Sequence, residues 1–238
     1  MTALRLTPIF LGGRWMRMVE RNLLVYRHGW LMILSGFFEP LFYLLGIGFG
    51  LGTLVGAVPG PNGVPVPYPV FVAPALLAAS SMNGAITEST FNFFFKLNYD
   101  KTFASILTTP MSPGDISIGE LCWALIRGAL YTLGFLAVMM LLGLAQSPLV
   151  IFTIPGALLI GFAFASVGMA ATSFMRTWQD FDLIQLVVLP MFLFSGTFFP
   201  IDAYPAALRI LIQITPLYRG VDLLRSLRQF TDRLPPPA

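Results

Sequence analysis

The sequence is poor in sulfur, imidazole and charged side chains. Among 238 residues there is one cysteine, Cys122, and one histidine, His28. One cysteine excludes a disulfide within the chain, and so few thiols and imidazoles argue against a zinc-type metal site. Charged residues make up only 11% of the chain, whereas soluble domains carry about 25%. We therefore expect no metal, no cofactor and no ordinary soluble domain.

The charges are also absent from long stretches. Residues 40–87 and 128–175 contain no Asp, Glu, Lys or Arg over 48 residues each, and 183–201 is a third such run of 19. A helix needs about 20 apolar residues to cross a bilayer. With 56% hydrophobic residues and a mean hydropathy of +0.79, the sequence predicts an all-α integral membrane protein with one transmembrane domain over 1–238. An unusually apolar soluble core is the alternative.

Turn residues and charges divide the apolar sequence into segments. An uncharged, Pro- and Gly-rich loop is predicted at 53–67. Two short amphipathic helices, near 204–214 and 217–230, are predicted before a Pro-rich tail. The five predicted spans are 30–52, 68–95, 120–143, 149–174 and 183–199.

The N-terminal segment, 1–29, is predicted to be cytoplasmic and to carry an amphipathic helix over 9–28. Its cations lie on one face, and Trp15 with other apolar residues lies on another, which is typical of a helix at a membrane surface. A helix packed on a soluble partner is the alternative. The segment holds five arginines, whereas the loops at 53–67 and 145–148 hold no basic residue. The positive-inside rule therefore places the connections at 96–120 and 176–182 in the cytoplasm as well.

Three ionisable residues lie inside the predicted spans: Glu39, Glu88 and Arg127. Such charges are costly in a bilayer and indicate function by default. Glu88 lies eight residues before Lys96 and Arg127 seven residues after Glu120, which puts Glu88 and Arg127 ~10–12 Å inside the cytoplasmic ends of their helices. We expect them to pair. A structural ion pair is the simpler interpretation, and a substrate or gating role is the alternative.

Several segments carry a resemblance to a known family. The first is the run Glu39-Pro40-Leu41-Phe42-Tyr43-Leu44-Leu45 with the glycine-rich 46–52, which resembles the first span of the ABC type-2 export permeases. APALLAASSMNGAITESTF (73–91) and TFASILTTPMSPGDISIGELCWALIRG (102–128) resemble the family's second span, cytoplasmic loop and third span. FSGTFFPIDAYP (194–205) and TPLYRGVDLLRSL (215–227) resemble its external hairpin, at 200–230 here. The likeness is greatest to the nodulation protein J group and looser to the daunorubicin-resistance permeases.

The resemblance implies a permease subunit of an ATP-driven exporter in the inner or plasma membrane. Such subunits pair as homo- or heterodimers, bind two copies of a separate ATPase, and move lipids, glycan-lipids or drug-like molecules. No G-x-x-x-x-G-K-[ST] pattern precedes either lysine, Lys96 or Lys101, so the chain is expected not to hydrolyse ATP itself. Nucleic acid is not an expected partner, since the basic residues flank the spans. An ion-coupled secondary transporter using the intramembrane carboxylates, or a membrane scaffold, remains as an alternative.

The resemblance also places a coupling loop for the ATPase at 96–117. Its mixture of charges and apolar groups, expected to be exposed, suits docking to a moving partner. A plain interfacial loop is the alternative. The candidate docking residues are Asp100, Lys101, Phe103, Ile106 and Leu107.

The family fold has six spans, with both termini in the cytoplasm. Only RQFTDRLPPPA follows the predicted hairpin here, and it is too short and polar to cross. A chain shortened relative to its relatives and a natural five-span variant both fit. In either case we expect an external C-terminus, with the five arginines after residue 204 left without a following span.

Overall fold

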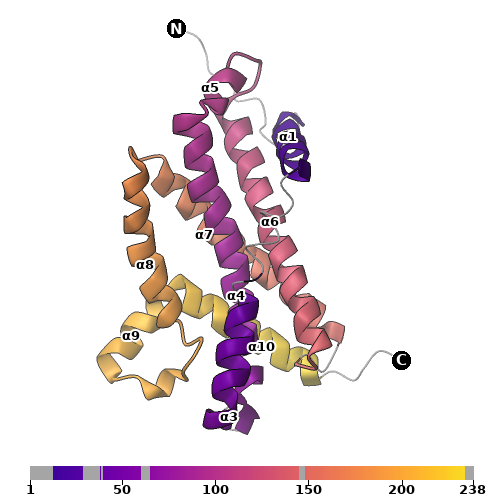
Figure 1. Cartoon of the computed structure of the whole chain (residues 1–238), viewed down its shortest axis with the longest axis vertical. Helices are drawn as coiled ribbons and strands as arrows, with labels where there is room; N and C mark the ends of the chain where they lie inside the picture. The colour runs from indigo at the N-terminus through magenta and orange to yellow at the C-terminus, as the bar shows by residue number, and fades with distance from the viewer. Residues whose placement is uncertain (1–12, 29–37, 39, 60–64, 145–147, 234–238) are drawn as a thin grey trace.

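The computed structural model describes residues 13–28, 38, 40–59, 65–144 and 148–233. Helices make up most of this part of the chain (Figure 1). They are α1 (Arg14–His28), η1 (Leu44–Leu51), α3 (Gly52–Val55), α4 (Tyr68–Thr87), η2 (Glu88–Asn92), η3 (Phe95–Tyr99), α5 (Thr102–Ile106), α6 (Pro113–Leu141), η4 (Pro148–Phe152), α7 (Thr153–Thr172), η5 (Trp178–Asp180), α8 (Phe181–Leu193), η6 (Ile201–Ala203), α9 (Ala206–Ile214) and α10 (Pro216–Arg233).

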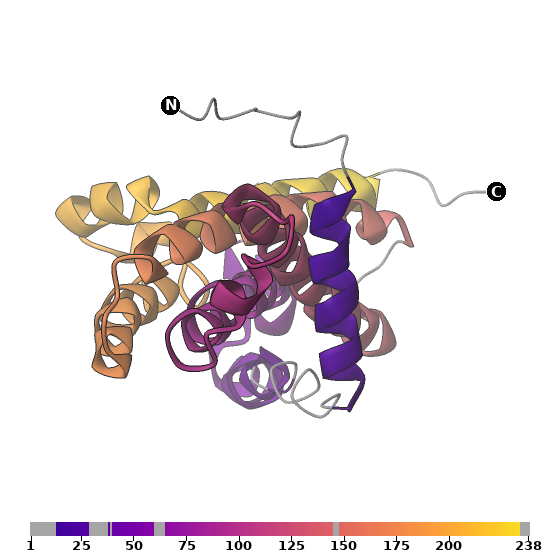
Figure 2. The ribbon, with the colours of Figure 1, turned by 90° about the horizontal axis from the view of Figure 1, so that it is seen from above.

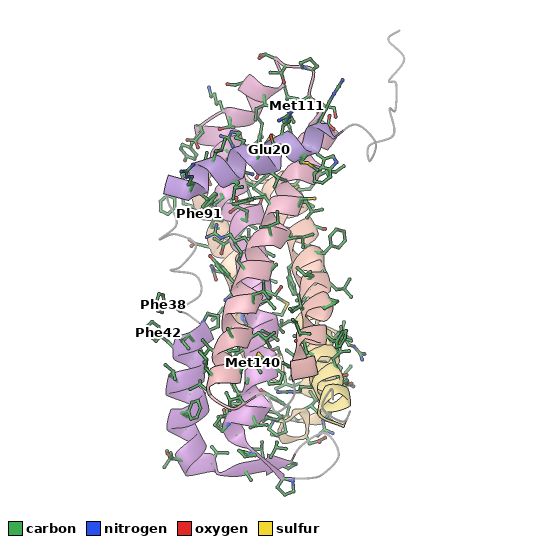
Figure 3. All side chains as sticks on the ribbon, turned by 90° about the vertical axis from the view of Figure 1, so that its right-hand side faces the viewer. Glu20, Phe38, Phe42, Phe91, Met111 and Met140 are labelled. Atoms are coloured by element: carbon green, nitrogen blue, oxygen red, sulfur yellow. The ribbon has the colours of Figure 1, made fainter. Side chains whose placement is uncertain are left out.

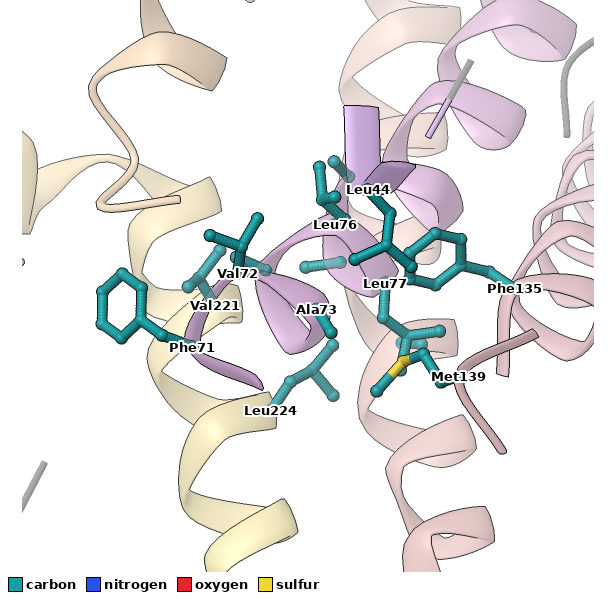
Figure 4. Close-up of a cluster of buried hydrophobic side chains, with 14 of the residues drawn as sticks. Leu44, Phe71, Val72, Ala73, Leu76, Leu77, Phe135, Met139, Val221 and Leu224 are labelled. Atoms are coloured by element: carbon teal, nitrogen blue, oxygen red, sulfur yellow. The ribbon is translucent and has the colours of Figure 1, made fainter. Parts of the chain in front are cut away.

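Helix α4 is the centre of the bundle. It packs against α6, α7, α10 and η1, and most of its residues are buried. Figure 4 shows the largest apolar cluster, in which α4 side chains meet Leu44 of η1, Phe135 and Met139 of α6, and Val221 and Leu224 of α10. A helix buried on nearly all sides is apolar around its whole circumference, which explains why α4 shows no amphipathic pattern.

Small residues let the long helices approach closely. A Cβ on Gly84 of α4 would lie 2.7 Å from the Tyr131 ring of α6, and one on Gly161 of α7 would lie 3.0 Å from Ser81 Oγ of α4. The Ser81 hydroxyl donates to Ala157 O across the same contact, at 2.6 Å. Close packing of small residues and interhelical hydrogen bonds are the usual means of helix association in lipid.

Three of the described helices are long and apolar enough to cross a membrane: Tyr68–Tyr99, Pro113–Leu141 and Val150–Thr172. The prediction that the second span ends at Lys96 is corrected, because the helix continues to Tyr99. The third begins at Pro113 rather than at 120, since Ser112 and Asp115 form a capping box there.

The first and fifth predicted spans are shorter helices. The first is described only over Pro40–Val55, and most of its N-terminal part lies outside the described residues. The fifth was predicted to run to 199, yet α8 ends at Leu193 after 13 residues, a length of ~20 Å. Residues 195–198 then turn back into the protein and are buried. Gly196, at φ +71°, permits this turn.

Within the predicted loop at 53–67, two strands of three residues pair in antiparallel fashion beside the helices of a mostly helical fold. Strand β1 (Ala57–Pro59) pairs with β2 (Pro65–Pro67), with Val58 opposite Val66. Val58 is buried in the main cluster, so the hairpin is joined to the bundle beside α4.

Two of the five arginines near the C-terminus have structural partners. The Arg225 guanidinium stacks 3.9 Å from the Phe71 ring centroid and donates to Gly196 O at 2.7 Å. Arg209 Nη1 lies 3.3 Å from Asp202 Oδ1. Arg225 therefore fixes the turn after α8, and Arg209 fixes the turn before α9.

The elements separate into two ends. Figure 1 places α1 and α5 at one end of the long helices and α3, α9 and α10 toward the other. Seen from above, α1 lies along one side of the bundle and α8 stands at the opposite side (Figure 2). Figure 3 shows α1 lying across the long helices, the arrangement expected of a helix at a membrane surface.

Candidate functional site

A buried ion network beneath α1 joins η2 and η3, which continue α4 to Tyr99, with α6. Glu88 Oε2 accepts from Arg127 Nη1 at 2.7 Å, and Glu88 Oε1 lies 3.0 Å from Lys96 Nζ. Lys96 Nζ continues to Glu120 Oε2 at 2.6 Å. The Glu88 and Glu120 side chains are almost wholly buried, and the cations are 12% and 6% exposed. Two acids and two bases balance formally, which offsets part of the desolvation cost of burying charge.

Helix α1 is tied to this network by two polar side chains. Asn22 Nδ2 donates to Glu120 Oε1 at 3.0 Å, and the Tyr26 hydroxyl donates to Glu88 Oε2 at 2.9 Å. Burial, with the neighbouring Glu88 carboxylate, raises the pKa of Tyr26, so its hydroxyl remains a donor. The Tyr26 ring also packs 5.2 Å from that of Trp123.

A glycine brings α1 against α6. A Cβ on Gly119 would meet Met18 and would lie 2.7 Å from Trp15 O. The face of α1 that packs on the bundle therefore contains Met18 and Asn22, which are both buried.

The helix is locally widened where it carries the network. Residues Glu88–Asn92 form a π-helical turn, and Asn92 Nδ2 donates to Glu88 Oε2 at 2.8 Å. Such turns are rare in proteins, and those that occur often lie at functional sites.

The ion pair expected between Glu88 and Arg127 is present, and its role remains a proposal. Glu39 lies outside the described residues, so its predicted share in the cluster is not described. Sequence reasoning missed Lys96 and Glu120 as members, because both were taken as markers of helix ends. Their spacing offered a signal: Lys96 lies eight residues after Glu88, close to two helical turns, so one face carries both.

The predicted coupling segment follows this network directly. Lys101 adopts a left-handed conformation (φ +48°) that turns the chain from η3 into α5. Arg14 Nη1 of α1 donates to Pro110 O at 2.8 Å on the far side of the segment. The segment is therefore held between the end of the second span, α1 and the start of α6.

Two predicted docking residues belong to the interior instead. Phe103 is 4% exposed and packs with Met18, Phe93 and Ile116, and Ile106 lies partly buried beside them. The prediction that both are exposed is wrong, because α5 is amphipathic and uses them to attach to the bundle. Leu107 is 45% exposed, and Asp100 and Lys101 are also exposed. Tyr99, 56% exposed, joins this accessible face.

Comparison with known proteins finds a family and a group of relatives that agree with each other. The family model described as "ABC-2 type transporter" matches residues 14–227. Nodulation protein J of Rhizobium leguminosarum bv. viciae is 33% identical over 90% of this chain and 82% of its own length. Nodulation protein J of Rhizobium leguminosarum bv. trifolii is 34% identical over 90% and 81%, and that of Rhizobium meliloti (strain 1021) is 33% identical over 90% and 80%. No solved structure shows a significant match.

Proposed function

Because the chain belongs to the ABC-2 type transporter family, we propose that it is the membrane-spanning permease subunit of an ATP-driven exporter in the cell membrane. Its substrate class is a lipid, a glycan-lipid or a drug-like molecule moved out of the cytoplasm. Two copies of a separate ATPase subunit dock on its cytoplasmic end, and a second permease subunit completes the pathway.

The observation that carries the proposal is the accessible face of the coupling segment. Tyr99, Lys101 and Leu107 are exposed at the cytoplasmic end, while Phe103 beneath them anchors α5 to the bundle. An exposed surface on a firmly held short helix suits a contact that transmits force. Movement of the segment reaches α4 and α6 through the ion network, because η3 carries Lys96 only five residues before Lys101.

The ion network supports a structural role for Glu88 within this mechanism. Glu88 faces two cations and accepts hydrogen bonds from Tyr26 and Asn92. A carboxylate with this many partners is suited to a fixed connection between helices, and less suited to binding and releasing a coupling ion. The secondary-transporter alternative therefore gains no support from this network. We propose that this connection keeps α1, α4 and α6 moving as one body.

The docking proposal is tested by co-purification with a candidate ABC ATPase subunit co-expressed in the same cells. Leu107→Asp places a charge on the accessible face and is expected to reduce the recovered ATPase about tenfold, or ~1.4 kcal/mol. Ser173→Asp, at an exposed position after α7, is the matched control and should leave recovery unchanged. Undiminished recovery with Leu107→Asp would count against docking on this segment.

The transport proposal is tested separately in proteoliposomes. The permease with its ATPase subunit should export substrate on addition of ATP, and the permease alone should not. Transport by the permease alone, driven by an ion gradient, would overturn the exporter assignment.

A further inference from the structure

A lateral groove separates α8 from the rest of the bundle. It has a volume of about 860 Å³ and runs between α8 on one side and α7 with η2 on the other. Its walls are apolar and include Phe164 and Val167 of α7 and Leu183, Val187 and Met191 of α8. Val167, Leu183 and Val187 are each more than 60% exposed, so the groove opens toward the surrounding lipid.

Among the described residues, the ionisable side chains that line the groove lie at its predicted cytoplasmic end. Arg176 and Asp180 line it there, in the turn between α7 and α8. Arg176 is the first charge after the uncharged run 128–175, so it lies where a span leaves the hydrocarbon. Trp178 in the same turn is 59% exposed, as is typical of residues at the headgroup level. Figure 1 shows this turn toward the same end of the molecule as α1.

The two side chains carry opposite charges, and they differ in their hydrogen bonds and exposure. Asp180 Oδ2 accepts from the backbone N–H groups of Arg176 and Thr177, at 2.8 and 3.0 Å. These bonds lower the pKa of Asp180, so its carboxylate is ionised at neutral pH. They use two of its roughly four acceptor positions. The Arg176 side chain is exposed and offers the planar fork that suits phosphate.

We propose that the groove binds a zwitterionic phospholipid with a primary amine, such as phosphatidylethanolamine. An acyl chain fills the apolar groove, the phosphate meets the Arg176 guanidinium, and the headgroup ammonium meets the Asp180 carboxylate. One cation and one anion at the rim match one anion and one cation in the headgroup, whereas an acidic phospholipid would satisfy Arg176 alone. This site goes beyond the proposed transport function and does not depend on an ATPase partner.

The position of the acyl chain is tested by photocrosslinking. The full chain is placed in nanodiscs with phosphatidylethanolamine that carries a diazirine in one acyl chain, and labelled peptides are mapped by mass spectrometry. We expect labelling to concentrate in 164–191. Ala171→Trp, which fills the groove, should lower it about tenfold. Ala170→Trp is the matched control, because Ala170 is also exposed but does not line the groove.

Equal labelling in these two variants, or labelling spread evenly over other lipid-facing helices, would overturn the site. The rival occupant is a second copy of this chain. This alternative is tested with the Val187→Cys variant in a Cys122→Ser background, by measuring disulfide-linked dimers after mild oxidation. Efficient formation of these dimers would show that a second copy, and not a lipid, fills the groove.

The headgroup assignment uses a second pair of probes with identical acyl chains. Phosphatidylethanolamine should label 164–191 about fivefold more than phosphatidylglycerol in the unsubstituted protein. Arg176→Gln should lower labelling by both lipids. Asp180→Asn keeps a hydrogen-bond acceptor but removes the charge, and it should abolish the preference while acyl labelling persists. Equal labelling by both lipids before any substitution would overturn the recognition of a zwitterionic headgroup.

Discussion

At the scale of single residues, the buried ion network shows how a membrane protein carries charge in its interior. Each charge has an opposite charge within 3.0 Å, and the polar groups of α1 close the network from the membrane surface. Breaking one partner of a buried pair is costly because the remaining charge stays in a poorly solvated place.

A double-mutant cycle on Glu88 and Arg127 tests this coupling. Glu88→Gln and Arg127→Gln are each expected to lower the free energy of unfolding in detergent by about 3 kcal/mol. The double variant should lose ~1–3 kcal/mol less than the sum of the two, because it leaves no uncompensated partner in this pair. The exposed pair of Arg17 and Glu20, with a 2.8 Å contact, is the control and should couple by no more than ~0.5 kcal/mol. Additive effects at Glu88 and Arg127 would contradict the pairing energy.

At the scale of elements, close contacts at a few positions attach the short helices to the bundle. Helix α1 meets α6 at Gly119, and α5 meets α1 and α6 through Phe103. These contacts decide which surfaces of the short helices are left for partners.

Gly119→Ala tests the α1 contact. The added methyl would collide with Met18 and the backbone of Trp15, so α1 must shift, at a cost of about 1–3 kcal/mol. Hydrogen–deuterium exchange of the α1 amides should become faster. Gly114→Ala, on the same helix, meets only Ser112 Oγ at 3.7 Å and should leave exchange as it is. Unchanged α1 exchange in Gly119→Ala would show that α1 is not held by this contact.

Phe103→Ala tests the attachment of α5. Phe103 is buried beside Phe93, with ring centroids 5.0 Å apart, so its truncation should cost about 3–5 kcal/mol of stability. Leu107→Ala, at an exposed position, should cost less than ~0.5 kcal/mol. Thermal unfolding in detergent measures both. A larger loss of stability for Leu107→Ala than for Phe103→Ala would contradict the interior role of Phe103 and the exposed, docking role of Leu107.

At the scale of the whole molecule, we expect the two ends of the bundle to face opposite sides of the membrane. The end with α1 and α5 carries arginines of the N-terminal segment, whereas the connections 53–67 and 145–148 hold no charge. The positive-inside rule therefore predicts that α5 is cytoplasmic and α10 external.

Cysteine labelling in intact cells tests the orientation. In a Cys122→Ser background, a membrane-impermeant maleimide should label Ala57→Cys and Ser226→Cys, both exposed at the outer end. Ser105→Cys on α5 should react only after the cells are permeabilised. Labelling of Ser105→Cys in intact cells, with protection of the other two, would reverse the topology.

The sequence by itself determined that the chain is an integral membrane protein of this family. It also located three helices long and apolar enough to cross a membrane and the two short C-terminal helices. These follow from hydropathy, charge-free runs and turn residues, which act over neighbouring residues and can be read along the chain. Even the pairing of Glu88 with Arg127 followed from a count of helical rise from the membrane surface.

Only the tertiary structure decided which faces the helices bury. Phe103 and Leu107 are both apolar residues of one short segment, and packing against α1 and α6 alone makes one interior and the other exposed. Lys96 and Glu120 became network members because side chains far apart in sequence meet there. The turn after α8 likewise depends on Arg225 reaching Gly196 across 29 residues, a contact that no local pattern encodes.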